Sequence, residues 1–151
     1  MKKVRIRWAR RSDGAALLAL IDALAGFEKL RKPTPAARRR LLKDAFGARK
    51  RFDVLLAEAG SEAVGYAIFF ETYSSFRALP TLFLEDIFVL PAHRGLGVGG
   101  QLFDRCVREA LRRGCGRMEW IVLDWNRSAQ KFYRRRNARQ MREWELYRLE
   151  F

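Results

Sequence analysis

Apolar and polar positions alternate along several short segments of the chain, as they do in strands that bury one face of a sheet. These segments are residues 3–9, 52–59, 63–72, 82–89 and 117–123. Only three residues separate the 52–59 segment from the 63–72 segment, a length typical of an antiparallel hairpin. The pattern therefore predicts a β-sheet with at least one antiparallel pair.

Other segments repeat apolar residues every three or four positions, which indicates amphipathic helices. Ser12 can cap the first helix, and the apolar face of that helix consists of Leu17, Leu20, Ile21, Leu24 and Phe27. In the second, Thr34 is a capping hydroxyl before Pro35, a residue suited to a first helical turn, and Gly47 ends the helix. Both helices are expected before the predicted hairpin.

A third helix, which ends near Gly114, connects the 82–89 strand to the 117–123 strand. Strands joined by a helix and lying side by side pair in parallel, so the sheet is expected to be mixed. A short helix at about 128–136 and a last segment that reaches Phe151 complete the chain. The pattern predicts one α/β (α+β) domain over residues 1–151, without linkers or repeats.

Length and composition agree with a globular domain that has no membrane segment. Of 151 residues, 49% are hydrophobic and 32% are charged, enough apolar material for one core. No apolar run reaches the roughly 18 residues of a membrane span, and the N-terminus lacks the core of a signal peptide. Cys106 and Cys115 have neither metal-ligand nor disulfide spacing. We expect a cytoplasmic protein with no membrane partner and no metal site.

The chain is strongly basic, with 31 Lys and Arg against 17 Asp and Glu and a formal net charge of +14. Such a field attracts polyanions. The basic residues are scattered in short clusters, and no helix-turn-helix, zinc-finger or RNA-recognition motif accompanies them. Nucleic acid is therefore not expected as the main partner, whereas a phosphate-bearing cofactor would profit from the same field.

A glycine-rich turn separates the 82–89 strand from the third helix. Its residues are Arg94, Gly95, Leu96, Gly97, Val98, Gly99 and Gly100. Backbone N–H groups at a helix N-terminus favour an anion, and glycines let that backbone approach phosphate oxygens. The alternative is a merely flexible turn. No Gly-Lys-Ser/Thr follows and no second βα unit supplies an acidic residue, so the turn is neither a Walker loop nor a dinucleotide fingerprint.

The order of several motifs resembles the GCN5-related N-acetyltransferase (GNAT) superfamily. They are Leu84-Glu85-Asp86-Ile87-Phe88-Val89, Arg94-x-x-Gly97-x-Gly99, Asp124-Trp125-Asn126 and Phe132-Tyr133. Phe27-Glu28, Thr72-Tyr73-Ser74-Ser75-Phe76 and Arg117-Met118-Glu119-Trp120 resemble the branch that contains diamine (spermidine/spermine) and thialysine acetyltransferases. The resemblance implies the GNAT fold, with a mixed central sheet of six to seven strands flanked by about four helices.

The resemblance also implies acetyl-coenzyme A (acetyl-CoA) as the co-substrate. In that interpretation the residues from Arg94 to Gly100 hold the pyrophosphate. Strand residues Ile87, Phe88 and Val89 present backbone groups to the pantetheine arm, and Asn126 and Ser128 contact the cofactor near the short helix. The alternative for Asn126 is a plain helix cap.

The chemistry of acetyl transfer needs two groups, one to take a proton from the ammonium and one to give a proton to the departing thiolate. Glu85 or Asp86, in a mostly apolar strand, can take the proton, since neighbours on a strand point to opposite faces. The resemblance favours Glu85. It also implies Tyr133 as the acid, although Tyr133 could instead be an aromatic residue on a buried helix face. Backbone N–H groups near Ile87 would meet the charge on the thioester oxygen.

Phe27, Glu28, Glu85 and Glu119 match the acceptor end of the diamine-like branch, which implies a small primary amine as substrate. The basic residues that follow Glu28 would repel a polycation and favour a lysine-like amine that carries a carboxylate. Alternatives are a protein-lysine or ribosomal N-terminal acetyltransferase, or a nucleic-acid-associated module of the same fold.

The resemblance implies a homodimer as well. The C-terminal segment supports it with five apolar side chains, Trp144, Leu146, Tyr147, Leu149 and Phe151. The alternative is that this segment is only the last strand of the chain's own sheet.

Overall fold

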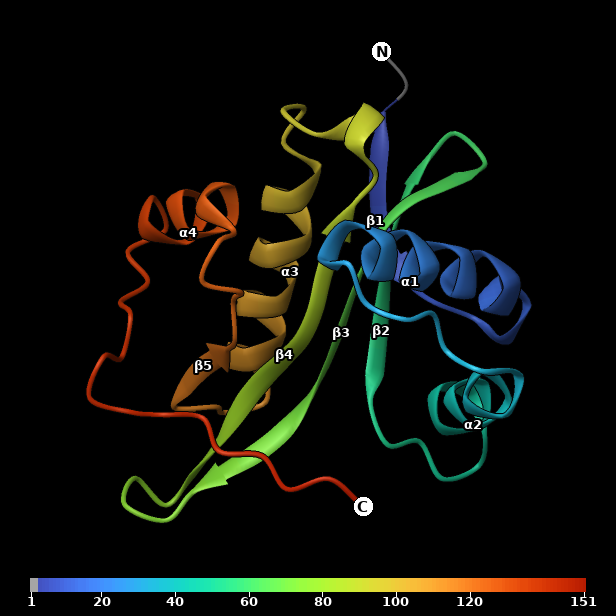
Figure 1. The fold of residues 1–151 in the computed structure, drawn as a ribbon. Helices are drawn as coiled ribbons and strands as arrows, with labels where there is room; N and C mark the ends of the chain where they lie inside the picture. The colour runs from blue at the N-terminus through green and yellow to red at the C-terminus, as the bar shows by residue number, and fades with distance from the viewer. Residues whose placement is uncertain (1–2) are drawn as a thin grey trace. The chain divides into compact units, whose positions relative to one another are not determined.

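The alternating segments form a single sheet in a computed structural model that describes residues 3–151. Its strands, in spatial order, are β1 (Val4–Trp8), β2 (Asp53–Ala59), β3 (Glu62–Ser74), β4 (Leu79–Val89) and β5 (Arg117–Trp120). Neighbours pair antiparallel except β4 and β5, which are parallel (Figure 1). The mixed α+β fold and the β2–β3 hairpin are therefore confirmed.

The predicted number of six to seven strands is wrong, because the described part of the chain has five. The strand expected over 117–123 ends at Trp120, and the segment from 138 to 151 contains no strand. Alternation alone does not make a strand, since its backbone needs a neighbouring strand to pair with. From Arg139 onward every residue of that segment is exposed.

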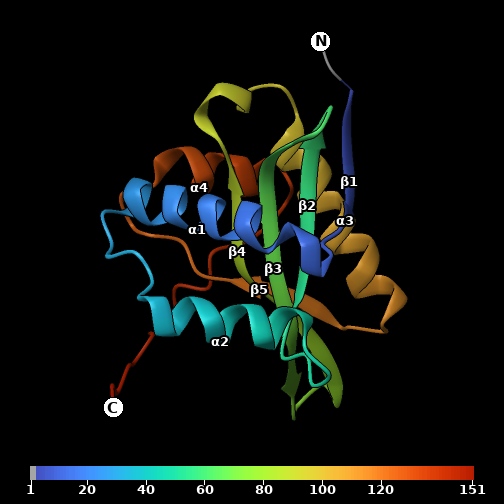
Figure 2. The same cartoon turned by 90° about the vertical axis from the view of Figure 1, so that its right-hand side faces the viewer.

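Two layers of helices cover the sheet. Helices α1 (Gly14–Glu28) and α2 (Pro35–Phe46) lie on one face, and α3 (Val98–Arg112) lies on the other (Figures 1 and 2). The core under α1 and α2 consists of Leu17, Leu20, Ala45, Val54, Leu56, Tyr66, Ile68 and Phe88. Helix α3 buries Leu102, Phe103, Cys106 and Ala110. Because successive strand residues point to opposite faces, β3 and β4 supply side chains to both layers.

The helix starts follow local chemistry, with one difference from expectation. The Thr34 hydroxyl accepts a hydrogen bond from the Ala37 N–H at 3.2 Å, which confirms the predicted cap of α2. Ser12 does not cap α1, because it lies inside a short 3₁₀ turn, η1 (Arg11–Asp13), and the N-cap position belongs to Asp13. The Asp13 carboxylate accepts hydrogen bonds from the Arg10 N–H at 2.6 Å and from Arg7 at 2.8 Å. A charged acceptor paired in this way fixes the turn.

Contacts within the chain define two compact units, one that ends at Trp120 and one from Ile121 to Phe151. The first unit holds the sheet, helices α1 to α3 and a second 3₁₀ turn, η2 (Pro91–His93). The second holds the short helix α4 (Arg127–Arg134), and its C-terminal apolar side chains are exposed, Trp144 by 73% and Tyr147 by 85%. No helix among residues 3–151 has the length and apolar character that a membrane span requires.

Candidate active site

Strand β4 carries a β-bulge at the two adjacent carboxylates that the sequence singled out. Ile68 of β3 lies opposite Asp86 and Phe69 lies opposite Leu84, so that Glu85 is left without a partner in the register. A bulge of this kind bends its strand and turns side chains away from simple alternation, and it is frequent beside active sites.

The bulge gives the two carboxylates different environments. The Glu85 side chain is exposed, although the strand that carries it is mostly apolar. Asp86 is half-buried, and its Oδ2 accepts a hydrogen bond of 3.0 Å from the hydroxyl of Tyr66. Burial raises the pKa of Asp86 to about 6; the Tyr66 hydrogen bond opposes that rise, and the charges of Glu85 and Glu28 add to it. Sequence reasoning missed Tyr66, because nothing local links it to a carboxylate 20 positions away.

The end of α1 brings two further predicted residues to this place. The Phe27 ring lies 6.5 Å from the ring of Phe88, next to the bulge on β4. Glu28 is half-buried, and burial raises its pKa. The negative charges of Glu28 and Glu85 raise the pKa of both Asp86 and Tyr66, so these carboxylates lie near one another. We call Glu28, Glu85 and Asp86 the acidic cluster.

Glu119, the fourth residue predicted for the acceptor end, lies on β5 opposite Phe83. Its carboxylate is paired with the Nε of Arg117 at 3.0 Å, and about half of its side chain is exposed. The structure therefore places Glu119 in the strand next to the acidic cluster, with its charge partly neutralised.

The glycine-rich turn, residues 94–100, is the predicted anion cradle. Gly95 and Gly97 have left-handed backbones, with φ of 74° and 79°. Gly97 is the N-cap of α3, and no side chain caps that helix. A Cβ on either glycine would meet nothing within 4 Å, so the space beside these two residues is open. The first N–H groups of α3 can therefore face a ligand anion.

The other residues of the turn have different environments. The side chain of Val98 is buried in the core and that of Leu96 is partly exposed, while Gly99 and Gly100 form the first turn of α3. A contact from Val98 to a ligand would therefore use its backbone only.

Arg94 connects the glycine-rich turn to the end of β4 and to the end of α1. Its Nε donates a hydrogen bond of 2.9 Å to the carbonyl of Val89, the last residue of β4. The guanidinium lies over the rings of Phe27 at 4.7 Å and Phe88 at 5.3 Å, which are cation–π distances. Arg94 thus joins the cradle, the end of β4 and the end of α1.

The end of β4 leaves one edge of its backbone without a strand partner. Strand β5 pairs with β4 only from Thr81 to Leu84, whereas β3 continues to pair as far as Val89. On the β5 side, the backbone groups of Ile87, Phe88 and Val89 therefore pair with no strand among residues 3–151. An extended ligand can use such an edge, as an added strand does.

The remaining predicted residues lie in the second unit. The Asn126 side chain accepts a hydrogen bond of 3.1 Å from the Ala129 N–H and caps α4, so the capping role considered for Asn126 is confirmed. Ser128 is exposed in the first turn of that helix. Tyr133 is half-buried, and its ring meets the ring of Phe132 edge-on at 5.2 Å. A role in cofactor binding or proton transfer for these residues stays a prediction.

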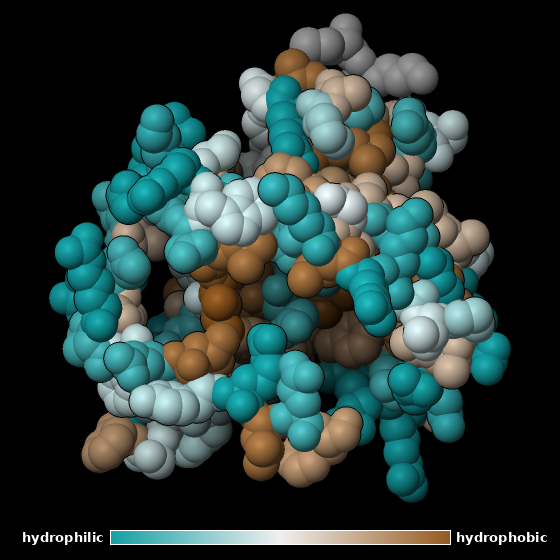
Figure 3. Space-filling model, in the orientation of Figure 1, coloured by the Kyte–Doolittle hydropathy of each residue, from teal (hydrophilic) through white to brown (hydrophobic). Residues whose placement is uncertain are grey.

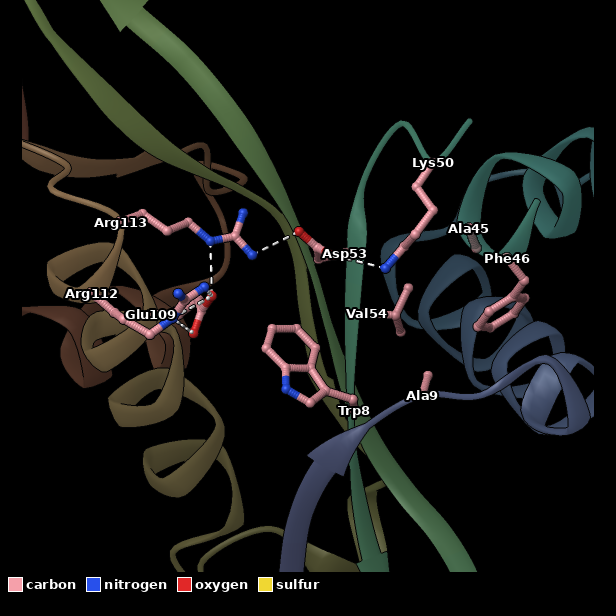
Figure 4. Close-up of a pocket in the computed structure, with 10 residues that line it drawn as sticks. All are labelled: Trp8, Ala9, Ala45, Phe46, Lys50, Asp53, Val54, Glu109, Arg112 and Arg113. Carbon is pink, nitrogen blue, oxygen red and sulfur yellow. Dashed lines mark hydrogen bonds and ion pairs between the residues drawn. The ribbon is translucent and has the colours of Figure 1, made fainter. Parts of the chain in front are cut away.

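A hollow of about 190 Å³ is lined by none of the predicted site residues (Figure 4). Figure 4 shows its ion pairs. Arg113 contacts Asp53 and Glu109, each at 2.8 Å, and Lys50 contacts Asp53 at 2.9 Å. Glu109 is only 3% exposed, and its hydrogen bonds with Arg112 and Arg113 lower its pKa to about 2. Three basic side chains, Lys50, Arg112 and Arg113, thus surround the two carboxylates of Asp53 and Glu109.

Comparison with known families shows the family to which this chain belongs. The model of the Acetyltransferase (GNAT) family matches residues 7–138. The chain belongs to the GNAT family. It is therefore an acetyl-CoA-dependent N-acetyltransferase, which confirms the resemblance seen in its motifs.

The similarity to relatives covers between about half and nearly all of the chain. A thialysine N-epsilon-acetyltransferase of Mus musculus is 35% identical, covering 99% of this chain and 94% of its own. An L-ornithine N5-acetyltransferase of Arabidopsis thaliana is 41% identical over 56% of this chain and 37% of its own. The solved structure of a probable acetyltransferase is 25% identical, with a TM-score of 0.84 and 97% of each chain covered.

The residues of this GNAT chain fit acetyl-CoA. The open space beside Gly95 and Gly97 and the uncapped N-terminus of α3 suit a pyrophosphate. The free edge at Ile87 to Val89 suits the extended pantetheine arm. When bound, acetyl-CoA supplies the acetyl thioester for the reaction.

Proposed function

We propose that this GNAT protein acetylates a primary amine of a small molecule, either a lysine-like amino acid or a diamine. The observation that carries the proposal is the acidic cluster of Glu28, Glu85 and Asp86 beside the open glycine turn. Clustered carboxylates attract an ammonium group. The names of the relatives support the same class, since they include thialysine and L-ornithine acetyltransferases.

In the proposed mechanism a carboxylate of the bulge takes a proton from the ammonium, so that the nitrogen lone pair can attack the thioester carbon. The family resemblance assigns this step to Glu85, directly or through water. Backbone N–H groups near Ile87 stabilise the oxygen that becomes negative. Tyr133 gives a proton to the departing sulfur. Phe27 and Glu119 line the acceptor end.

The charges next to Glu28 favour an amine that also carries a carboxylate. Helix α1 ends at Glu28 and is followed by Lys29, Arg31 and Lys32, all exposed. Figure 3 shows hydrophilic side chains over much of the surface on the side drawn. A bipolar substrate would place its ammonium at the acidic cluster and its carboxylate toward these bases, whereas spermidine or spermine would be repelled.

The test measures how fast the coenzyme A thiol is released with pairs of amines, the two members of each pair differing only in a carboxylate. Lysine is compared with cadaverine, and thialysine with its decarboxylated diamine, while basic peptides represent the protein-acetyltransferase alternative. We expect kcat/KM to be at least about tenfold higher for the member that carries the carboxylate, the size of one good charged contact. Equal turnover within a pair refutes the bipolar substrate, and turnover of peptides alone refutes the small-molecule proposal.

Two double variants test whether the basic residues after Glu28 cause the preference for an amine that carries a carboxylate. In Arg31→Gln/Lys32→Gln the lysine-to-cadaverine ratio should fall toward one. The control, Arg49→Gln/Arg51→Gln, removes the same charge from exposed positions beyond the other end of α2 and should leave the ratio unchanged. A fall of the same size in both variants would show a general field effect and no local contact.

We also propose a homodimer, as the family resemblance implies. The exposure of Trp144, Leu146, Tyr147, Leu149 and Phe151 supports it, because apolar side chains gathered in one segment favour a partner surface. Glu143, Glu145 and Glu150 alternate with them and soften the repulsion between two basic chains.

A further inference from the structure

Tyr66 is a buried polar residue that neither the motifs nor the family resemblance singled out. Its side chain is 0% exposed, and its ring lies 6.4 Å from the ring of Phe88. Its hydroxyl donates a hydrogen bond of 3.0 Å to Oδ2 of Asp86 across the β3–β4 pair. A buried phenol keeps its place only with a partner, and here the partner is a carboxylate of the acidic cluster.

The geometry distinguishes Asp86 from Glu85. The hydroxyl of Tyr66 holds Oδ2 of the short Asp86 side chain, so Oδ1 would be the oxygen to meet an ammonium. Glu85 is exposed on the bulge, and its longer side chain must lose more rotamer freedom to reach one geometry. A base has to be positioned before its pKa matters.

The electrostatics agree with the geometry. The groups that act on Asp86 are the Tyr66 hydroxyl from β3, Glu85 from its own strand and Glu28 from α1. Burial, with a smaller contribution from the two neighbouring carboxylates, raises the pKa of Asp86 to about 6, and the hydrogen bond from Tyr66 opposes that rise. A carboxylate that titrates near 6 is ionised at neutral pH and is still basic enough to take a proton.

We propose that Asp86, in place of Glu85, accepts the proton of the acceptor ammonium, and that Tyr66 is the positioning residue that orients Asp86 and keeps it ionised. This inference rests on the proposed function. The N–H bond of the ammonium breaks, its proton moves to Oδ1 of Asp86, and the freed lone pair forms the C–N bond. The C–S bond breaks as the amide forms, and the thiolate leaves with its electron pair and takes up a proton.

The first test measures kcat/KM against pH with the amine that performs best in the substrate screen. The wild type should lose activity as the pH falls through about 6, because Asp86 becomes protonated. Asp86→Asn should lower kcat by roughly 100-fold or more, the usual range for losing a general base. Glu85→Gln should lower it by less than about tenfold and keep the acid limb. A large loss in Glu85→Gln with an active Asp86→Asn overturns the assignment.

Tyr66→Phe tests the positioning role. Without the hydroxyl, the acid limb should move up by about one pH unit, since the hydrogen bond favours the charged carboxylate. Activity at high pH and acetyl-CoA affinity should stay within a few-fold of wild type. Tyr73→Phe is the control, because it removes a phenol from an exposed position on the same strand. An acid limb that does not move in Tyr66→Phe refutes the role of Tyr66.

A measurement without turnover separates this inference from the proposed function. Carbon-13 NMR of the side-chain carboxyls follows the titration of Asp86 in the free protein, and its midpoint should rise in Tyr66→Phe and stay unchanged in Tyr73→Phe. An unchanged midpoint in Tyr66→Phe overturns the pairing even if amines are acetylated. A shifted midpoint in a protein that acetylates no amine refutes the proposed function, and the role of Asp86 as proton acceptor falls with it.

Discussion

Replacing Gly97 by valine should separate cofactor binding from stability. Gly97 has φ of 79°, and the N-terminus of α3 follows it. A side chain there strains the backbone by about 1–2 kcal/mol. Since a Cβ would meet nothing within 4 Å, no steric cost is added in the free protein. For a chain of this length the strain lowers Tm by about 2–8 °C, and the protein stays folded.

The effect on acetyl-CoA should be much larger. A β-branched residue drives the backbone away from the left-handed region, which turns the first N–H groups of α3 from the pyrophosphate. A hydrogen bond to a charged group contributes about 1.5–3 kcal/mol, so losing two weakens affinity on the order of 100-fold or more. Calorimetric titration of acetyl-CoA measures this loss directly.

Gly114→Val is the matched control. Gly114 has φ of 71°, an added Cβ there also meets nothing within 4 Å, and it follows the C-terminal end of the same helix. The control should lower Tm by a similar amount and leave acetyl-CoA affinity unchanged. The reasoning is refuted if Gly97→Val binds acetyl-CoA within about threefold of wild type, or if both variants lose affinity equally.

Three further predictions concern other parts of the chain. Tyr133→Phe should lower kcat by roughly 10- to 1000-fold with acetyl-CoA affinity nearly unchanged, and wild-type turnover in this variant would remove Tyr133 from the mechanism. The ion pairs of Glu109 lower its pKa from 4.5 to about 2, so this carboxylate stabilises the fold fully above pH 4.5 and progressively less as the pH falls toward 2. The Tm difference between wild type and Glu109→Gln should therefore shrink between pH 4.5 and pH 2. A Tm difference that does not depend on pH would contradict this prediction. Light scattering at moderate salt should give about twice 17.6 kDa, and a mass near 17.6 kDa at micromolar concentration would exclude the homodimer.

Local features of the chain are determined by the sequence itself. Thr34 before Pro35 predicts the start of α2, and the structure shows that cap. The glycines between 95 and 100 predict a turn between the 82–89 strand and α3, and the structure has that turn, with positive φ at Gly95 and Gly97. These features depend on backbone sterics and on hydrogen bonds between residues a few positions apart, so a short stretch of sequence contains all the necessary information.

The tertiary structure decides everything that depends on pairing across the sheet. Alternation leaves Glu85 and Asp86 equivalent until the bulge opposite Ile68 and Phe69 exposes one and half-buries the other. The hydrogen bond from Tyr66 to Asp86 joins residues that are distant in the chain and neighbours in the sheet. Such contacts follow from register, and register is set by how the whole hydrophobic face is buried.

The same reason explains the wrong strand count. The segment after residue 138 has the apolar content of a strand, yet a strand exists only where another strand meets its backbone. Local pattern therefore determined the helices, most of the strands and the position of the glycine turn, and the order of the motifs indicated the family. The burial of each carboxylate, and hence its charge and its capacity to take a proton, was decided only when distant strands came into register.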